Sequence, residues 1–395
     1  MIKNLSSDKL LFWSIGLFMF LVPIAVSPAV IAGGLVIAVW IFSGMFWKDR
    51  GWLKQEWTMP VFLFMLLPWV GLIWTSDVHM GLKFAQRSYY WLYAFAAATA
   101  TGADQSGGRS RALINAFLAG LGVSFIISLF QLAHLLPMGE GNTPTSFVNH
   151  MSYTLFLAFA VVMGSFYYRQ AGSGRGKLLP VIMMAAFFFN LLIASGRSGY
   201  LAFVLISPLI AINIFGKKNA LKAALLLAIL GVIFFSAPMV RSRIRDGMAD
   251  LKQLSHGHEN TEVGLRVYFW KGAFKIFKKH PLLGAGTGGY GDAMEQFRTP
   301  AFPRSVQPHN SFIYMMVSFG VPGIFCIIWL FYVFLKKGCS ARSGAVGYSV
   351  LMYGIVLIIG SFTDTQILSI ATAELFAVMT GLNVSEEPCQ RSLFI

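Results

Sequence analysis

The chain has 395 residues, of which 56% are hydrophobic and 12% are charged. Soluble domains average roughly a quarter charged residues, so this composition excludes an ordinary soluble protein and predicts one that is embedded in lipid. The 31 Lys and Arg residues outnumber the 16 Asp and Glu residues. In a membrane protein, such an excess indicates topology and contact with anionic headgroups rather than binding to nucleic acid.

The N-terminal region predicts a retained first helix rather than a cleaved leader. Lys3 and Lys9 precede an apolar run over residues 10–24, as they would in a secretory signal. Pro28 directly follows the small residues at 25–27 and disfavours cleavage there. A second apolar run begins at once, so we expect the first run to stay in the membrane.

Hydropathy predicts about twelve transmembrane helices, because a helix needs about 20 mostly apolar residues to cross a bilayer. The expected spans lie near residues 10–26, 28–47, 59–74, 89–103, 112–136, 151–168, 178–194, 199–215, 220–238, 310–335, 345–362 and 366–383. The predicted fold class is therefore all-α: a polytopic membrane protein with a single integral membrane domain over residues 1–395.

The basic residues predict the orientation of these helices. Seventeen Lys and Arg residues fall in the segments expected on one side, whereas the short segments on the other side hold only Lys83, Arg87 and Arg197. Short cytoplasmic loops collect Lys and Arg. We therefore expect a multi-pass protein of the bacterial inner, or cytoplasmic, membrane, with both termini in the cytoplasm.

Residues 239–308 are predicted to form a long periplasmic loop between spans nine and ten. Within it, apolar residues recur at helical spacing while lysines gather elsewhere on the helical wheel; the apolar positions are Val263, Val267, Trp270, Phe274 and Phe277. This pattern is typical of an amphipathic helix that lies on the membrane. Pro281 and the glycines that follow, up to Gly291, end that helix.

The cysteines and the glycine-rich segment exclude several classes of site. Cys326, Cys339 and Cys389 form no CxxC pair and have no metal-ligand spacing, so neither a disulfide framework nor structural zinc is predicted. The glycines at 284–291 lack the Gly-Lys-Ser or Gly-Lys-Thr of a nucleotide-binding loop. We expect no cofactor and no metal.

Arg197 is the first candidate site residue. It interrupts apolar sequence where span seven ends and span eight begins on the outer side. The side chain would either extend to the lipid headgroups or bind an anion, because a guanidinium beside the N-terminal amides of a helix is a ready phosphate site. The sequence around Arg197 leaves both interpretations open.

His309 is the second candidate, in Pro308-His309-Asn310-Ser311 at the outer start of span ten. An interfacial histidine is commonly only a polar boundary residue. Here Asn310 or Ser311 can cap the helix and leave the imidazole free, and Gly320 and Gly323 allow a bend lower down. A neutral His309 would accept a proton.

Arg266 is the third candidate, at the start of the amphipathic helix and so near headgroup depth. Taken alone, it fits a solvated or lipid-facing charge better than a site residue. The predicted topology, however, places Arg197, Arg266 and His309 on one face of the membrane. Their convergence is what favours a site.

Other polar residues carry weaker signals. Lys83 and Arg87 would bind either pyrophosphate and acidic sugars or lipid headgroups. Asn149 and His150 open span six, where helix capping is the simpler interpretation. Glu374 lies deep in span twelve, so we expect it to pair with a buried donor.

The combined motifs resemble the O-antigen ligase and polymerase superfamily. The most specific element is His-Asn, nine residues, then Gly-x-x-Gly, met by His309, Asn310, Gly320 and Gly323. The other elements are Gly196-Arg197-Ser198-Gly199, Gly264-Leu265-Arg266 to Trp270, and His280-Pro281-Leu282-Leu283-Gly284. The local resemblance covers about residues 190–325, and it is most similar to an O-antigen ligase, that is, a lipid A core:surface polymer ligase.

The resemblance implies a metal-independent membrane glycosyltransferase that acts at the periplasmic face in lipopolysaccharide biosynthesis. It implies a donor glycan linked to polyprenyl pyrophosphate and, as acceptor, the lipid A core oligosaccharide. The family's catalytic arginines and histidine fall on Arg197, Arg266 and His309. Lys83, Arg87 and Asn310 are then the expected substrate-binding residues.

Elementary chemistry agrees with that expectation. Displacement of a pyrophosphate requires stabilisation of the charge that develops on the leaving oxygen, which metal-dependent transferases achieve with a cation held by carboxylates. This sequence contains no Asp-x-Asp motif. Two arginines and helix N-terminal amides can stabilise the same charge, while His309 deprotonates or orients the acceptor hydroxyl.

Three other functions stay open on sequence alone. An O-antigen polymerase, which extends carrier-linked repeats, would share these motifs. A transporter of lipid-linked sugars would instead need ionisable residues deep in several spans, and only Glu374 is plainly deep. A scaffold role of the long loop would not need His309.

Overall fold

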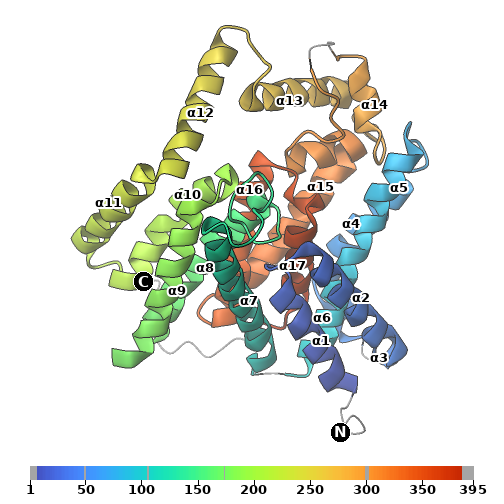
Figure 1. Cartoon of the computed structure of the whole chain (residues 1–395). Coiled ribbons are helices and arrows are strands. Elements are labelled where there is room, and N and C mark those ends of the chain that lie inside the picture. Colours follow the sequence, from blue (N-terminus) through green and yellow to red (C-terminus); the bar gives the residue numbers. More distant parts are fainter. Residues whose placement is uncertain (1–6, 49, 105, 173, 299–301, 385–395) are drawn as a thin grey trace.

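The computed structural model describes residues 7–48, 50–104, 106–172, 174–298 and 302–384. Within these ranges the chain is helical and has only isolated β-bridges, with no strand (Figure 1). The predicted all-α, polytopic fold class is confirmed. Lys3, Cys389 and Arg391, which entered the predictions above, lie outside the described residues.

The N-terminal half begins with the packed helices α1 (Ser7–Leu21) and α2 (Val26–Phe42), which are followed by α3 (Met45–Lys48), the 3-10 helix η1 (Gly51–Lys54) and α4 (Thr58–Val70). A continuous helical path then runs through α5 (Val78–Gln86), η2 (Arg87–Trp91) and α6 (Leu92–Gly102), before α7 (Gly108–Leu132). The segment expected as a plain loop between spans three and four is therefore largely α5, because Asp77 Oδ1 accepts a hydrogen bond from Met80 N and caps a helix there.

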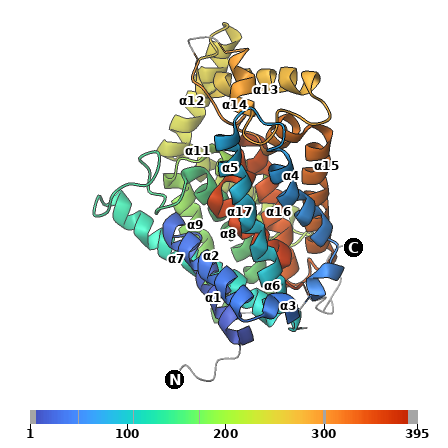
Figure 2. The ribbon, with the colours of Figure 1, turned by 90° about the vertical axis from the view of Figure 1, so that its right-hand side faces the viewer.

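The centre of the bundle is formed by α8 (His150–Gln170), α16 (Ala345–Thr363) and α17 (Ile370–Gly381), which are buried along most of their lengths. Around them pack η3 (Gly174–Lys177) with α9 (Leu178–Ile193), α10 (Arg197–Phe215) and α15 (Ser311–Ser340) on different sides (Figures 1 and 2). The 3-10 helix η4 (Gln366–Leu368) joins α16 to α17.

Each of the twelve predicted spans coincides with a helix, but their lengths differ. In the described part of the chain, six helices are long and apolar enough to cross a membrane, or up to seven if one bent pair is a single span. The apolar helices α2, α4 and α17 are shorter, and α6 has only 11 residues. At 1.5 Å per residue, α6 and α17 do not cross a hydrocarbon core of about 30 Å by themselves.

Large apolar side chains cover the outside of the bundle. On α9 and α11 (Ala220–Ser236) they include Leu178, Leu179, Leu221, Leu225 and Val232, all well exposed. Soluble monomers rarely expose contiguous apolar surface on this scale. The outer surface is therefore suited to lipid, as the composition predicts.

Residues 239–308 are mostly helical and lie at the top of the molecule, beyond the bundle (Figures 1 and 2). They comprise α12 (Pro238–Ser255), bent by 76° from α11, then α13 (Glu262–Lys279) and α14 (Tyr290–Glu295). The predicted helix over 263–277 is confirmed as α13. Its packed side differs from the predicted stripe: Phe269, Ala273 and Ile276 are buried while Phe274 is exposed, because α13 packs on α14 and α15.

The glycine-rich segment after α13 is hydrogen-bonded to α15. Gly320 bends α15 with a φ of 65°, and the bend lets Val321 N donate to the carbonyl oxygen of Pro281 over 2.9 Å. Ala285 N and Gly286 N donate to the carbonyls of Val317 and Ser318. A side chain at Gly320 would strike the Pro281–Leu282 backbone. The glycine-rich segment and the bend at Gly320 thus belong to one packing contact, although they are separated in sequence.

Candidate functional site

Two glycines place Arg197 at the start of α10. A Cβ atom at Gly196 or at Gly199 would collide with Thr154 on α8. The glycines therefore let α10 approach α8 closely, which holds Arg197 at a fixed position beside the N-terminus of α8. No side chain caps α10, so its first amides keep no side-chain acceptor.

His309 is held by the cap of the next helix. Asn310 Oδ1 accepts hydrogen bonds from the backbone N–H groups of Phe312 and Ile313, and Asn310 Nδ2 donates to the carbonyl of Phe362 on α16. His309 itself has a φ of 53°, an uncommon conformation for a residue with a side chain. This backbone geometry turns the imidazole away from the helix that follows it.

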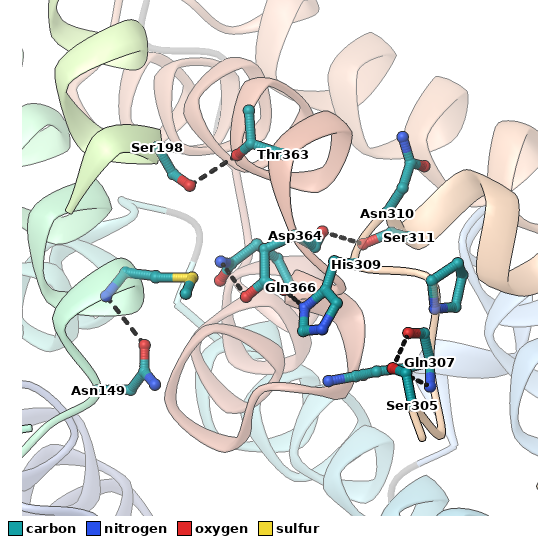
Figure 3. Close-up of polar contacts among 12 residues, drawn as sticks. Asn149, Ser198, Ser305, Gln307, His309, Asn310, Ser311, Thr363, Asp364 and Gln366 are labelled. Atoms are coloured by element: carbon teal, nitrogen blue, oxygen red, sulfur yellow. Dashed lines mark hydrogen bonds and ion pairs between the residues drawn. The ribbon is translucent and has the colours of Figure 1, made fainter. Parts of the chain in front are cut away.

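The imidazole of His309 faces Asp364 at the end of α16 (Figure 3). His309 Nδ1 lies 3.0 Å from Asp364 Oδ1. An ionised carboxylate can only accept a hydrogen bond, so the neutral ring carries its hydrogen on Nδ1 and keeps the Nε2 lone pair free. Ser311 Oγ also donates to the Asp364 carbonyl, which ties the start of α15 to the end of α16.

Arg197, Arg266 and His309 line one cavity of about 380 Å³. They come from α10, α13 and the start of α15, which are distant in sequence. The same cavity is lined by Arg243 of α12, by Glu262, and by His150 at the start of α8. The structure therefore brings together all three residues that the sequence singles out as catalytic candidates.

The guanidinium of Arg197 has carboxylate neighbours in the absence of substrate. One terminal nitrogen lies 3.0 Å from Glu262 Oε2 and 3.7 Å from Asp250 Oδ2. Its Nε is buried and has no partner among the described residues. A phosphate that binds this edge of Arg197 must therefore displace Glu262, whose side chain is 64% exposed.

Arg266 is the less neutralised of the two arginines. Burial lowers the pKa of the Arg266 guanidinium from its ordinary value, and the nearby Arg197 lowers it further, while Asp364 and Glu262 act in the opposite direction. None of the described residues forms an ion pair or hydrogen bond with its guanidinium. A partly buried cation without an acceptor, in a cavity with a second guanidinium, is a strong site for an anion.

A second cavity, of about 270 Å³, is bordered by Asp364, the carboxylate partner of His309. Asp364 and Gln307 line it, together with Arg87 of η2 and Asn149. Arg87 donates to the Leu368 carbonyl over 2.9 Å. Lys83 is exposed on α5 and lines neither cavity. Arg87 thus lies close to the candidate catalytic pair, whereas Lys83 does not.

Asn310 lies near the site but its side-chain amide is used for structure. Both the oxygen and the nitrogen have backbone partners, and the residue is 4% exposed. Its proximity to substrate stays a prediction. The contacts make it a positioning residue for His309.

Sequence reasoning missed three charged residues of the first cavity and its surroundings: Asp364, Arg243 and Glu262. Asn149, read as a cap, does cap α8 through Met151 N. The expected donor for Glu374 is wrong for the described residues, because neither carboxyl oxygen has a hydrogen-bond partner. The reason is that α17 packs on α6, whose sequence is mostly alanine and threonine.

The described residues contain no group of three or more His, Cys, Asp or Glu side chains arranged to hold a metal ion. The charged groups of the first cavity are instead mostly cationic. They can hold an anion, and His309 beside them can accept a proton.

Comparison with known proteins supports the motif analysis. The sequence model of the O-antigen ligase family matches residues 182–328, which include Arg197, Arg266 and His309. The O-antigen ligase of Salmonella typhimurium strain LT2 is 22% identical over 236 residues, which cover 56% of this chain and 56% of that protein. The chain thus spans about half the length of the curated relative. Both findings confirm the resemblance to the O-antigen ligase superfamily.

Proposed function

We propose that this chain, which shares the O-antigen ligase sequence pattern over residues 182–328, is a membrane glycosyltransferase. It transfers an O-antigen glycan from a polyprenyl-pyrophosphate carrier to a hydroxyl of the lipid A core oligosaccharide at the periplasmic face of the inner membrane. One observation carries the proposal: Arg197, Arg266 and His309 line a single cavity, and His309 is bonded to Asp364 on its other nitrogen.

The donor pyrophosphate binds in the first cavity. Arg197 and Arg266 contact its oxygens by charge-assisted hydrogen bonds, and the uncapped amides at the start of α10 add partial positive charge. Arg243 adds a third cation on the same wall. Glu262 leaves Arg197 when the pyrophosphate arrives, because two anions cannot share one guanidinium edge without repulsion.

His309 acts on the acceptor. Its Nε2 takes the proton of the acceptor hydroxyl as the oxygen attacks the anomeric carbon of the glycan. The bond from that carbon to the pyrophosphate oxygen breaks, and the carrier leaves as free polyprenyl pyrophosphate. Asp364 stabilises the imidazolium that forms.

The charge on the leaving oxygen grows during this step, so cations fixed beforehand lower the barrier. Removal of one such donor in other enzymes typically costs about 10² to 10³ in rate. The arginines are fixed by helix packing: Gly196 and Gly199 seat α10, and α13 packs on α15. The site therefore needs little reorganisation around the leaving group.

The test is transfer in vitro from a carrier-linked glycan to purified acceptor lipid, in the presence of a chelator. We expect activity from the wild-type protein, and a loss of about 100-fold or more for His309→Ala and Arg197→Ala. Lys278→Ala, on the exposed side of α13, is the matched control and keeps its activity. Full activity of His309→Ala would overturn the proposal.

A gene deletion separates this proposal from a polymerase. Loss of a ligase leaves carrier-linked polymer and no long chains on lipopolysaccharide. Loss of a polymerase leaves a single repeat on the core. The single-repeat outcome would replace the ligase assignment while keeping the glycosyl-transfer chemistry.

A further inference from the structure

A larger cavity, of about 590 Å³, lies at the other end of the bundle from the candidate site. It is lined by Trp52 of η1, Trp57 before α4, Gly102 at the end of α6, and Lys336 and Lys337 near the end of α15. Lys337 follows His309 by 28 residues and lies near the end of the bent helix α15, whereas His309 precedes its start. This cavity is thus independent of the transfer chemistry.

Lys337 is the unusual residue of this cavity. Its Nζ donates to the carbonyl of Thr380 over 2.6 Å and lies 6.0 Å from the ring centroid of Trp57. The neighbouring Lys336 is neutralised by Glu56, with both carboxylate oxygens within 2.8 Å. No carboxylate of the described residues forms an ion pair with Lys337. An ammonium carries three donors, so two remain for a ligand.

A purely structural role explains only part of this arrangement. A lysine near a helix end can stabilise the last carbonyls, and Lys337 does so for α17. That role requires no cavity, and a compact end of the bundle would serve it better. A lysine that has no acidic partner among the described residues and that borders an open volume instead indicates a site for an anion.

We propose that this cavity binds the phosphate of an anionic phospholipid headgroup, with Lys337 as its principal contact. Basic pockets between transmembrane helices on the cytoplasmic side recognise such headgroups. The surroundings fit a lipid: Trp52 and Trp57 are aromatic residues of the type that lies at headgroup depth, and the basic residues on this side predict the cytoplasmic leaflet. The acyl chains of that lipid lie along the apolar outer surface of the helices.

The test is a binding measurement on the purified full-length protein, with defined lipid added to detergent micelles. Phosphatidylglycerol and phosphatidylcholine are titrated in parallel, and bound lipid is detected by native mass spectrometry. We expect the wild type to prefer phosphatidylglycerol. Lys337→Gln should weaken that binding by about tenfold or more, because one charge-assisted contact is lost.

Two further variants separate the effect of the positive charge of Lys337 from the effect of the open volume of the cavity. Lys9→Gln removes the same charge at an exposed position on α1, outside the cavity, and should bind phosphatidylglycerol like the wild type. Gly102→Phe retains Lys337 but adds a side chain to the cavity wall, where a Cβ atom meets no heavy atom within 4 Å. It should lose binding as Lys337→Gln does, which keeps the test valid if Lys337→Gln fails to fold.

The outcomes are distinct. Equal binding of the two lipids by the wild type, or wild-type binding by both Lys337→Gln and Gly102→Phe, would overturn the proposal. Competition by inorganic phosphate at the same concentration as the lipid would also overturn it, since the site would then bind a free ion rather than a headgroup.

Discussion

At the scale of single residues, Asp364 determines how the His309 imidazole can act. The 3.0 Å contact between His309 Nδ1 and Asp364 Oδ1 fixes both the tautomer and the ring orientation. The ring lines the cavity of Arg197 and Arg266, and its basic nitrogen Nε2 is left free. An aspartate that comes 55 residues after the histidine, at the end of another helix, is thereby bonded to the proposed base.

Replacement of Asp364 by asparagine tests this coupling. We expect Asp364→Asn to lower the transfer rate by about 10² to 10⁴, because the amide neither stabilises the imidazolium nor selects the tautomer. The KM for acceptor lipid should change little. Asp292→Asn, which removes an exposed partner of Arg304, is the control. A rate for Asp364→Asn within about threefold of the wild type would show that the contact is not used.

Replacement of Arg266 by lysine should change the pH dependence of the transfer activity. Burial lowers the pKa of the Arg266 guanidinium, yet arginine starts so high that it stays charged. A lysine in the same place starts near 10.4 and is lowered by the same burial. A cation with a depressed pKa loses its charge as pH rises through that pKa, so Arg266→Lys should lose transfer activity at a lower alkaline pH than the wild type.

The measurement is a pH–rate profile from about pH 7 to 10 for both proteins. The loss in Arg266→Lys should reverse on return to neutral pH, which separates titration from unfolding. Parallel profiles for the two proteins would contradict a buried cationic role for position 266.

Sequence reasoning found the residues that stand out locally and missed those that do not. Arg197 and His309 interrupt apolar sequence at helix starts, and they do reach a common cavity. Asp364 and Arg243 were not found, because a single charge at the end of an apolar helix or among other basic residues has no local pattern. Their place depends on how α16 and α12 pack, which spacing alone does not reveal.

At the scale of elements, the close approach of α10 to α8 decides where Arg197 lies. Gly196 and Gly199 both contact Thr154, but in different ways. At Gly196 the nearest atom is the Thr154 hydroxyl and the His150 carbonyl oxygen also lies at 2.7 Å, whereas at Gly199 the close atoms are the Cβ and the backbone of Thr154. A smaller side chain at position 154 therefore relieves part of the collision at Gly196 and none of the collision at Gly199.

Gly196→Ala should reduce transfer and destabilise the protein by about 1–3 kcal/mol, since overpacking displaces α10. The second substitution Thr154→Ala should restore part of both losses. Gly199→Ala should not be restored by Thr154→Ala. Rates and thermal unfolding of the four proteins, compared with Thr154→Ala alone, check this; equal rescue of both glycine variants would refute the packing argument.

The positions of the apolar helices were predictable from hydropathy, but their lengths were not. The predicted spans at 89–103 and 366–383 correspond to α6 and α17, which are shortened by the 3-10 helices η2 and η4. Tyr89, Tyr90 and Trp91 lie in the 3-10 helix η2 rather than in α6, and Gln366 is buried within η4. The shortening brings Arg87 and Asp364 to the second cavity.

At the scale of the whole molecule, the predicted orientation in the membrane would place the two ends of the bundle in different compartments. The cavity of His309 is lined in part by α12 and α13, which lie at the top of Figure 1, whereas the cavity of Lys337 is lined by residues near the ends of α6 and α15. The distribution of Lys and Arg predicts that the upper end is periplasmic.

Cysteine labelling tests the orientation. In a background without other cysteines, Lys278→Cys on α13 should react with a membrane-impermeant thiol reagent in cells with a permeable outer membrane. Cys339, exposed at the end of α15, should react only after the inner membrane is disrupted. The reverse pattern would place the candidate site in the cytoplasm and exclude the proposed donor and acceptor.

A structure of the protein with polyprenyl pyrophosphate bound would test the shared site most directly. We expect the pyrophosphate to lie in the 380 Å³ cavity, within hydrogen-bond distance of both Arg197 and Arg266, with Glu262 turned away from Arg197 and His309 Nε2 facing the anomeric position. A pyrophosphate bound elsewhere, with Arg266 still lacking a partner, would contradict it.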